Sequence, residues 1–163
     1  MFKTIIQDKF LTQTACKKLI EFYKKGLPKS FNTTYPLELN PLEHTSLVNK
    51  INKVGIDINN SVVDWFQIVK WPTPNRGKQL HTDEASHKTS LSSIIYLNDD
   101  YRGGHTFFED NTSFAPVEGR AIFFNGKYYP HGVSSIDEGD RYTVAVWLKK
   151  INTQLFVKQY QKT

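Results

Sequence analysis

Short apolar runs separated by turn-forming residues dominate the chain from Ser61 onward. The runs are rich in the β-branched and aromatic residues that strands prefer. They cover residues 62–71, 89–97, 105–109, 120–125, 129–134 and 141–149. Turn residues such as the Gly103-Gly104 pair lie between them. Many short strands with this spacing are typical of a β-sandwich or a β-barrel. We therefore predict a mainly β core over residues 61–149.

Two helices are expected to support this core, after a short strand at residues 2–6. The first helix has Thr12 as its N-cap and ends at Gly26. Its apolar stripe comprises Leu19, Ile20, Phe22 and Tyr23. The second helix covers residues 41–54. Its predicted inner face comprises Leu42, Leu47, Val48, Ile51 and Val54. Both helices are expected to pack against the sheet.

The rest of the chain fits one domain of 163 residues. Residues 28–41 contain three prolines and predict a loop. We assign residues 1–60 to the helical support and residues 150–163 to a tail. The loop at residues 72–80 is either a substrate lid or a plain surface connection.

Cysteine and charge content limit the cellular setting. The single cysteine, Cys16, excludes an intramolecular disulfide, suggests a buried structural thiol and fits a cytoplasmic protein. No apolar run is long enough for a membrane span, so we expect a soluble chain. The net charge of +5 comes mainly from lysines near both ends. We interpret them as a solvated face, because no arginine-rich segment or nucleic-acid module is present.

His81-Thr82-Asp83 is the motif with the clearest chemistry. In an extended segment, residues two apart point to the same face, so the imidazole and the carboxylate converge. A third ligand must come from another strand, and His131, after the apolar run at residues 121–124, fits best. Two histidines and one carboxylate form the facial triad that holds non-heme Fe(II) and leaves positions open.

Arg141 lies at the start of the last predicted strand, in the run Gly139-Asp140-Arg141-Tyr142-Thr143. An inward-pointing arginine is costly unless it meets an anion, and its planar guanidinium suits a carboxylate. A carboxylate-bearing cosubstrate would explain such a residue. An exposed turn arginine after Asp137-Glu138 is the alternative reading.

Several runs together resemble the signature of prolyl 4-hydroxylase-type 2-oxoglutarate/Fe(II) dioxygenases. They are residues 96–108, 116–124, 131–134 and 139–143, followed by Trp147. The resemblance covers residues 62–149 and, more loosely, the helix at residues 12–26. It implies a double-stranded β-helix (a jelly-roll, cupin-like core) with N-terminal supporting helices.

Residue by residue, the resemblance assigns His81, Asp83 and His131 as iron ligands. Arg141 matches the basic residue that pairs with the distal carboxylate of 2-oxoglutarate. The other matching positions are Tyr96, expected to hydrogen-bond the same carboxylate, Thr106, on the strand lining the cosubstrate pocket, and Trp147, near the active site. Trp71 stands nearest to a tyrosine that the family places before its first ligand and that contacts the cosubstrate, so Trp71 is a further candidate for cosubstrate binding, although the spacing here has one extra residue.

The resemblance also implies a reaction. With Fe(II), 2-oxoglutarate and O2, and ascorbate as reductant, such an enzyme hydroxylates a substrate and releases succinate and CO2. The nearest subfamily predicts a prolyl residue in a peptide or protein as substrate, and we expect a monomer. Apolar residues are expected to shield the pocket, namely Ile94, Phe107, Phe123 and Val144.

Three alternatives stay open. A nucleic-acid oxygenase of the demethylase type shares the triad, but its second arginine falls on the position of Trp147, so nucleic acid is not expected as a partner. A non-catalytic metal-binding jelly-roll module has no reason to keep the triad together with Arg141 and Tyr96. A free amino-acid hydroxylase is not excluded by the sequence.

Overall fold

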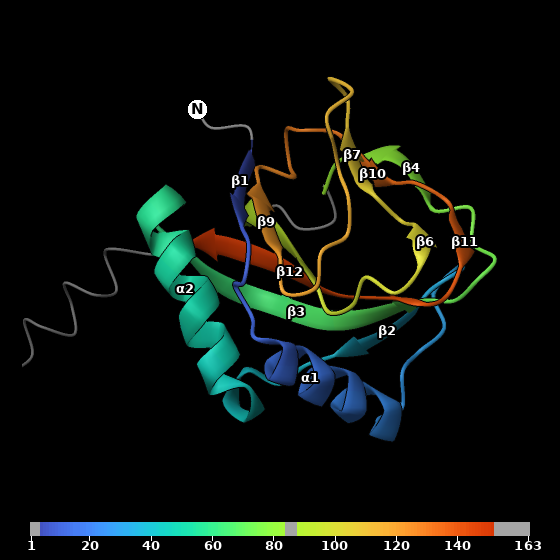
Figure 1. Cartoon of the computed structure of the whole chain (residues 1–163). Coiled ribbons are helices and arrows are strands. Elements are labelled where there is room, and N and C mark those ends of the chain that lie inside the picture. The colour runs from blue at the N-terminus through green and yellow to red at the C-terminus, as the bar shows by residue number, and fades with distance from the viewer. Residues whose placement is uncertain (1–3, 84–87, 152–163) are drawn as a thin grey trace, which may run out of the picture.

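Two antiparallel sheets form the body of the molecule in the computed structural model, which describes residues 4–83 and 88–151. The larger sheet has six strands in the order β1-β9-β5-β12-β3-β2. Their bounds are β1 Thr4–Gln7, β2 Tyr35–Glu38, β3 Ser61–Trp71, β5 Thr89–Tyr96, β9 Ala121–Phe124 and β12 Arg141–Lys150. Strands β3 and β12 pair along nearly their whole lengths, from Arg141 opposite Trp71 to Lys150 opposite Ser61. This pair forms the long central part of the sheet (Figure 1).

The smaller sheet has four strands in the order β4-β10-β7-β8. Their bounds are β4 Lys78–His81, β7 Thr106–Phe108, β8 Ser113–Phe114 and β10 His131–Val133. A separate two-stranded ribbon joins β6 (Arg102–Gly103) to β11 (Ile136–Glu138). This mainly β arrangement of antiparallel sheets agrees with the predicted jelly-roll core.

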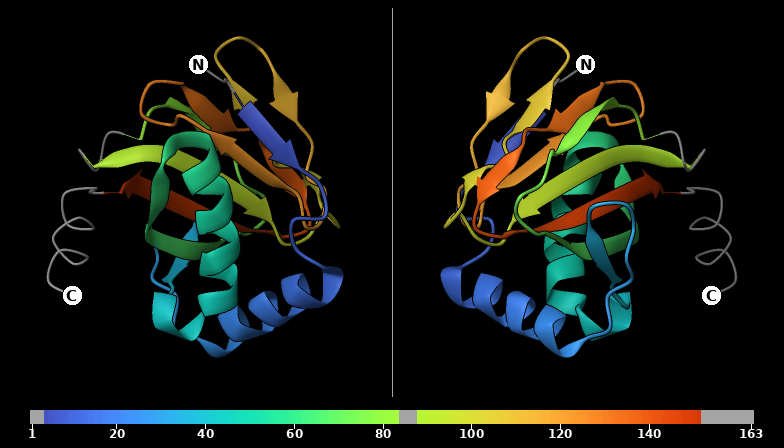
Figure 2. Two further views of the ribbon diagram at one scale, coloured as in Figure 1. Left: turned by 90° about the vertical axis from the view of Figure 1, so that its left-hand side faces the viewer. Right: turned by 90° about the vertical axis from the view of Figure 1, so that its right-hand side faces the viewer.

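The helices α1 (Gln13–Lys25) and α2 (Thr45–Asn59) cover one face of the larger sheet (Figures 1 and 2). A short 3-10 helix, η1 (Pro41–Glu43), precedes α2. Thr12 caps α1 as predicted, because its Oγ1 accepts a hydrogen bond from the amide of Ala15 at 3.1 Å. In the described parts of the chain, no helix has both the length and the apolar character needed to cross a membrane.

The helices and the sheet share one large apolar core. Its fully buried members include Cys16 from α1, Ile51 from α2, and Phe66, Phe123 and Val144 from the sheet. The prediction of a buried Cys16 is therefore confirmed. Alternate residues of β12 point the other way, so Arg141 and Thr143 line a cavity between the sheets while Val144 packs under the helices.

This alternation corrects part of the predicted shielding of the pocket. Ile94 lines the cavity as expected, but Phe123 and Val144 belong to the helix-side core, and Phe107 is not among the lining residues. Phe124, one position further along β9, faces the cavity instead of Phe123. A shift of one residue in a strand moves a side chain to the opposite face, so apolar character alone does not assign the side.

The helical region also differs from the prediction at several points. Phe22 and Leu42 are 40% and 84% exposed, so neither belongs to the inner face of its helix. Helix α2 starts after η1 and continues to Asn59, five residues beyond the predicted end. Residues 28–41, expected as loop, contain β2, a sheet-edge strand in which Pro36 is tolerated. The proposed tail lies mostly outside the described residues.

Candidate metal centre

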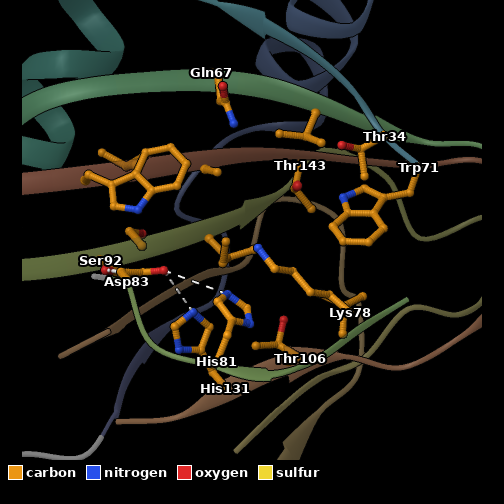
Figure 3. A pocket seen from close by; sticks show the side chains of 18 of the residues that line it. Thr34, Gln67, Trp71, Lys78, His81, Asp83, Ser92, Thr106, His131 and Thr143 are labelled. Carbon is orange, nitrogen blue, oxygen red and sulfur yellow. Dashed lines mark hydrogen bonds and ion pairs between the residues drawn. The ribbon is translucent and has the colours of Figure 1, made fainter. Parts of the chain in front are cut away.

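His81, Asp83 and His131 come together where β4 and β10 lie side by side. His81 is the last residue of β4, His131 is the first of β10, and the two stand opposite each other in the pairing. One ligand atom from each of the three residues lies within 4.8 Å of the others. Nε2 of His131 lies 3.4 Å and Nε2 of His81 lies 3.8 Å from Oδ1 of Asp83 (Figure 3). The structure thus brings all three predicted ligands to one point.

Each histidine is oriented by a backbone carbonyl two residues earlier. Nδ1 of His81 lies 2.9 Å from the carbonyl oxygen of Gln79, and Nδ1 of His131 lies 2.9 Å from that of Tyr129. A carbonyl oxygen can only accept, so both rings donate their Nδ1–H groups. The Nε2 lone pairs are then free to face a metal, as in many histidine-ligated sites.

The Asp83 carboxylate is fixed by two contacts that the sequence analysis missed. Its Oδ2 accepts a hydrogen bond of 2.6 Å from the Ser92 hydroxyl, which leaves Oδ1 facing the two imidazoles. Gly126 lies so close that a Cβ there would collide with Asp83 Oδ2 and Ser92 Oγ. The carboxylate therefore presents one oxygen to a metal. Period-two alternation from Tyr96 along β5 would have placed Ser92 on the same face.

The electrostatic environment favours the metal-binding forms of the ligands. Burial alone would raise the pKa of Asp83, but His131 and the Ser92 hydroxyl outweigh it and the net pKa is lowered. Burial lowers the pKa of His81, with repulsion from His131 and Lys78 acting in the same direction. At neutral pH the carboxylate is therefore ionised and the His81 imidazole neutral, which are the forms that ligate metals.

Arg141 is the largest fully buried side chain among the described residues, with 1% of its surface exposed. Its Nε donates a 3.0 Å hydrogen bond to the Gly104 carbonyl, and Nη1 lies 3.5 Å from the Thr143 hydroxyl. Within residues 4–83 and 88–151, Nη2 has no hydrogen-bond partner and no carboxylate pairs with the guanidinium. A buried cation in this state is ready for an anionic ligand.

Two aromatic rings lie close to this guanidinium, and one of them belongs to a hydrogen-bonded hydroxyl pair. Its Cζ lies 5.2 Å from the ring centroid of Trp71 and 5.4 Å from that of Tyr96. The hydroxyls of Tyr96 and Thr106 are 2.5 Å apart. Thr106 lines the cavity, whereas Tyr96 lies behind it and is fully buried. The structure therefore places Tyr96 beside both Thr106 and Arg141, and its direct contact to a cosubstrate stays a prediction.

A cavity of about 430 Å³ connects the triad with Arg141. Figure 3 shows Trp71 across the cavity from His81 and His131. Trp147, a predicted site residue, lines the wall and stacks on Trp65 with 3.9 Å between ring centroids. The remaining wall includes residues 31–34, which the sequence analysis had treated as an ordinary loop.

Lys78 also lines this cavity, although no sequence motif predicted it as a site residue. In the pairing of β4 with β10, His81 lies opposite His131 and Lys78 opposite Val133. Three steps on β4 thus match two steps on β10, which is a β-bulge. The extra residue places Lys78 on the same side as His81, although simple alternation would separate them. Figure 3 shows the Lys78 side chain reaching into the cavity.

This set of donors suits Fe(II). Two imidazoles and a one-oxygen carboxylate approach from one side, and the cavity lies on the other, where a metal would keep open positions. His44 and His105 take no part, since neither belongs to the group of metal-binding residues or to the cavity wall. His87 lies outside the described residues.

Comparisons with protein families, curated proteins and solved structures agree with one another. The family model described as the 2OG-Fe(II) oxygenase superfamily matches residues 66–149. Prolyl 3-hydroxylase 1 of Rattus norvegicus is 24% identical over 144 residues, which are 84% of this chain and 18% of the rat protein. The chain therefore spans less than a fifth of that relative.

Solved structures share the fold over most of the chain. The viral collagen prolyl hydroxylase of Paramecium Bursaria Chlorella virus-1, in its 2OG complex, superposes with a TM-score of 0.76 at 22% identity, covering 93% of this chain and 97% of the viral one. A prolyl hydroxylase of Trichoplax adhaerens, in complex with a hypoxia inducible factor peptide fragment, gives 0.72 at 16% identity, covering 90% and 83%. At these identities the likeness establishes the architecture.

Proposed function

The chain belongs to the 2OG-Fe(II) oxygenase superfamily, and we propose that it hydroxylates a prolyl residue in a peptide or protein, using Fe(II), 2-oxoglutarate and O2. One observation carries the oxygenase part of the proposal. A facial triad and a buried arginine with an unpaired Nη2 open into the same cavity. A structural arginine would have its partner within the fold, whereas a cosubstrate-binding arginine awaits one.

Different residues of the chain would bind the iron, bind the cosubstrate and exclude water. His81, Asp83 and His131 would hold Fe(II), and Arg141 would pair with the distal carboxylate of 2-oxoglutarate. Bound iron with this cosubstrate and O2 supplies the oxidising chemistry that converts a C–H bond into C–OH, with release of succinate and CO2. Trp71, Phe124 and Ile94 on the cavity wall exclude water, which keeps the reaction on the bound substrate.

The prolyl substrate is supported by the relatives and by the cavity wall. The rat relative and both structural neighbours are named as prolyl hydroxylases. Trp65 and Trp147 form an aromatic wall, a surface that suits proline rings and proline-rich segments. We also propose ascorbate as the reductant, and a monomeric, cytoplasmic protein, from the family resemblance and the single cysteine.

Mass spectrometry of substrates incubated with the protein, Fe(II), 2-oxoglutarate and ascorbate tests the proposal. The panel contains proline-rich peptides, free proline and a methylated oligonucleotide. We expect a one-oxygen gain on a prolyl peptide, absent in His131→Ala and retained in His105→Ala, a histidine outside the site. Omitting ascorbate tests the reductant, and size-exclusion chromatography tests the monomer.

Other outcomes select among the alternatives. Oxidation of free proline alone would indicate an amino-acid hydroxylase, and loss of the methyl group from the oligonucleotide a demethylase. Succinate without any modified product would keep the chemistry and reject the prolyl substrate. If iron is bound and neither succinate nor a modified product forms, the non-catalytic binding module becomes the favoured alternative.

A further inference from the structure

Lys78 brings a positive charge into the cavity that the proposed chemistry does not require. The bulge in β4 turns this side chain toward the same cavity as His81. Bulges beside active sites commonly re-aim one side chain in this way. No carboxylate forms an ion pair with Lys78 in the described parts of the chain. A cation placed in a binding cavity without a protein partner indicates an anionic group on a ligand.

The charges of the loaded cavity show which ligand this is. Among the described lining residues, the side chains with fixed charge are Asp83, Arg141 and Lys78. A ferrous ion, the Asp83 carboxylate, the Arg141 guanidinium and the doubly negative 2-oxoglutarate add up to zero. The ammonium of Lys78 therefore has no counter-charge among the described lining residues, the iron and the cosubstrate, and an anionic group on the substrate would balance it.

The depth of the two cations assigns them to different ligands. Arg141 is buried and lies against Trp71 and Tyr96. Lys78 is exposed to solvent, so its ammonium stays hydrated until a ligand covers it. Covering an ammonium removes its water, which is costly unless a counter-charge replaces that water. The exposed cation thus favours substrates that carry an anion near the reacting carbon.

We propose that Lys78 selects substrates with a carboxylate beside the hydroxylated carbon, an inference that rests on the oxygenase chemistry of the proposed function. Two sources supply such a group. One is an aspartate or glutamate next to the target proline in a peptide, and the other is the α-carboxylate of free proline.

Three variants separate charge from shape. Lys78→Gln removes the charge and keeps most of the length, whereas Lys78→Arg keeps the charge. Lys18→Gln is the matched control, because Lys18 is exposed on α1 and does not line the cavity. The probes are free proline and two prolyl peptides that differ only in glutamate or glutamine beside the proline. Binding to the Fe(II)-loaded protein with 2-oxoglutarate, without O2, is followed by tryptophan fluorescence, and KM is then measured separately for probe and 2-oxoglutarate.

With a peptide source, we expect the glutamate peptide to bind about tenfold tighter than the glutamine peptide, as for one charge-assisted contact near solvent. Lys78→Gln should abolish that preference, and Lys78→Arg and Lys18→Gln should keep it. With free proline as the source, free proline alone should lose affinity in Lys78→Gln.

Three results would overturn the proposal. The first is no preference for the glutamate peptide together with unchanged binding of free proline in Lys78→Gln. The second is a raised KM for 2-oxoglutarate alone, which would make Lys78 a cosubstrate contact. The third is that none of the three probes binds. Failure of the proposed oxygenase chemistry is separate, because it appears as the absence of succinate in the wild-type protein with every substrate, while the binding preference is still measured.

Discussion

The two faces of the six-stranded sheet differ in that only the cavity face combines apolar side chains with buried charged and polar groups, and β12 contributes to both faces in alternate residues. Tyr142 and Val144 pack under the helices, whereas Arg141 and Thr143 line the cavity. Apolar burial holds the helix side together. The cavity side keeps a buried guanidinium with an unpaired nitrogen. Stability and function are therefore divided between the faces of one strand layer, and substitutions should separate them.

Asp83→Ala should give the largest loss on the cavity side. Mutating a hydrogen-bond partner of a metal ligand typically lowers metal affinity or activity about 10–100-fold. Removal of a direct ligand should reduce Fe(II)-dependent succinate formation by more than this. The free energy of unfolding of the metal-free protein should change by less than about 1 kcal/mol, because no apolar core is disturbed. Turnover assays and urea unfolding measure the two effects. Retained turnover would contradict the triad, and a large loss of stability would contradict the division between faces.

Phe66→Ala should produce the opposite result on the helix side. Phe66 is fully buried in the helix-side core, so its truncation should lower the free energy of unfolding by about 3–5 kcal/mol. Leu27→Ala, at a side chain that is 92% exposed, is the control. At a temperature where the variant is still folded, its KM for 2-oxoglutarate should match the wild type. A changed KM would show that the two faces are coupled.

Arg141→Met should weaken 2-oxoglutarate binding about tenfold to hundredfold, because a charge-assisted contact is lost. The ligand-free protein should be as stable as the wild type or more stable, since an unpaired buried cation is replaced by an apolar side chain of similar volume. Calorimetry with 2-oxoglutarate and thermal unfolding without it measure these changes. Arg102→Met serves as the control, at an arginine whose side chain is 72% exposed. Equal losses of Fe(II) and 2-oxoglutarate affinity would instead mean that Arg141 is structural.

Ser92→Ala should have the smallest effect of the four. Without the hydroxyl, Oδ2 of Asp83 loses its hydrogen bond and the carboxylate is less firmly held. We expect Fe(II) affinity to fall about tenfold, the lower end of the range for outer contacts of metal ligands. The neighbouring Ser93 offers a control, because its buried hydroxyl has no partner in the described residues. If Ser92→Ala and Ser93→Ala bind Fe(II) equally well, the contact does not position Asp83.

The sequence predicted those parts of the site that depend on residue type and short spacing. His81, Asp83, His131 and Arg141 follow from the chemistry of their side chains and the family resemblance, and the structure brings them to one cavity. Lys78 could not be placed, because its direction depends on a bulge that exists only in the pairing of β4 with β10. For these residues, the local sequence indicates which side chains have the chemistry of a site, and strand pairing decides which way each side chain points.

The same limit explains the misplaced apolar residues. Leu42 and Phe22 fit an amphipathic pattern, yet Leu42 lies in η1, before the long helix begins, and Phe22 lies at the margin of the helix face. Strand β2 was missed because its proline argues against a strand. Proline is tolerated there because β2 pairs with β3 at the edge of the sheet, and the sequence does not reveal which strand lies at the edge. The periodicity of apolar residues predicts that a helix or strand exists. Its packing against the rest of the fold decides where it starts and which face is buried.

The long pairing of β3 with β12 has a consequence for folding during synthesis on the ribosome. Ser61 pairs with Lys150 and Trp71 with Arg141, so the central strands of the sheet meet only after the roughly seventy residues between them have been synthesised. Such distant pairings make folding slow and leave strand edges exposed in incomplete chains. Arg141 joins the cavity at this last step. A nascent chain could thus gather its iron ligands before it can hold a cosubstrate, and the order of synthesis delays a complete active site until the sheet has closed.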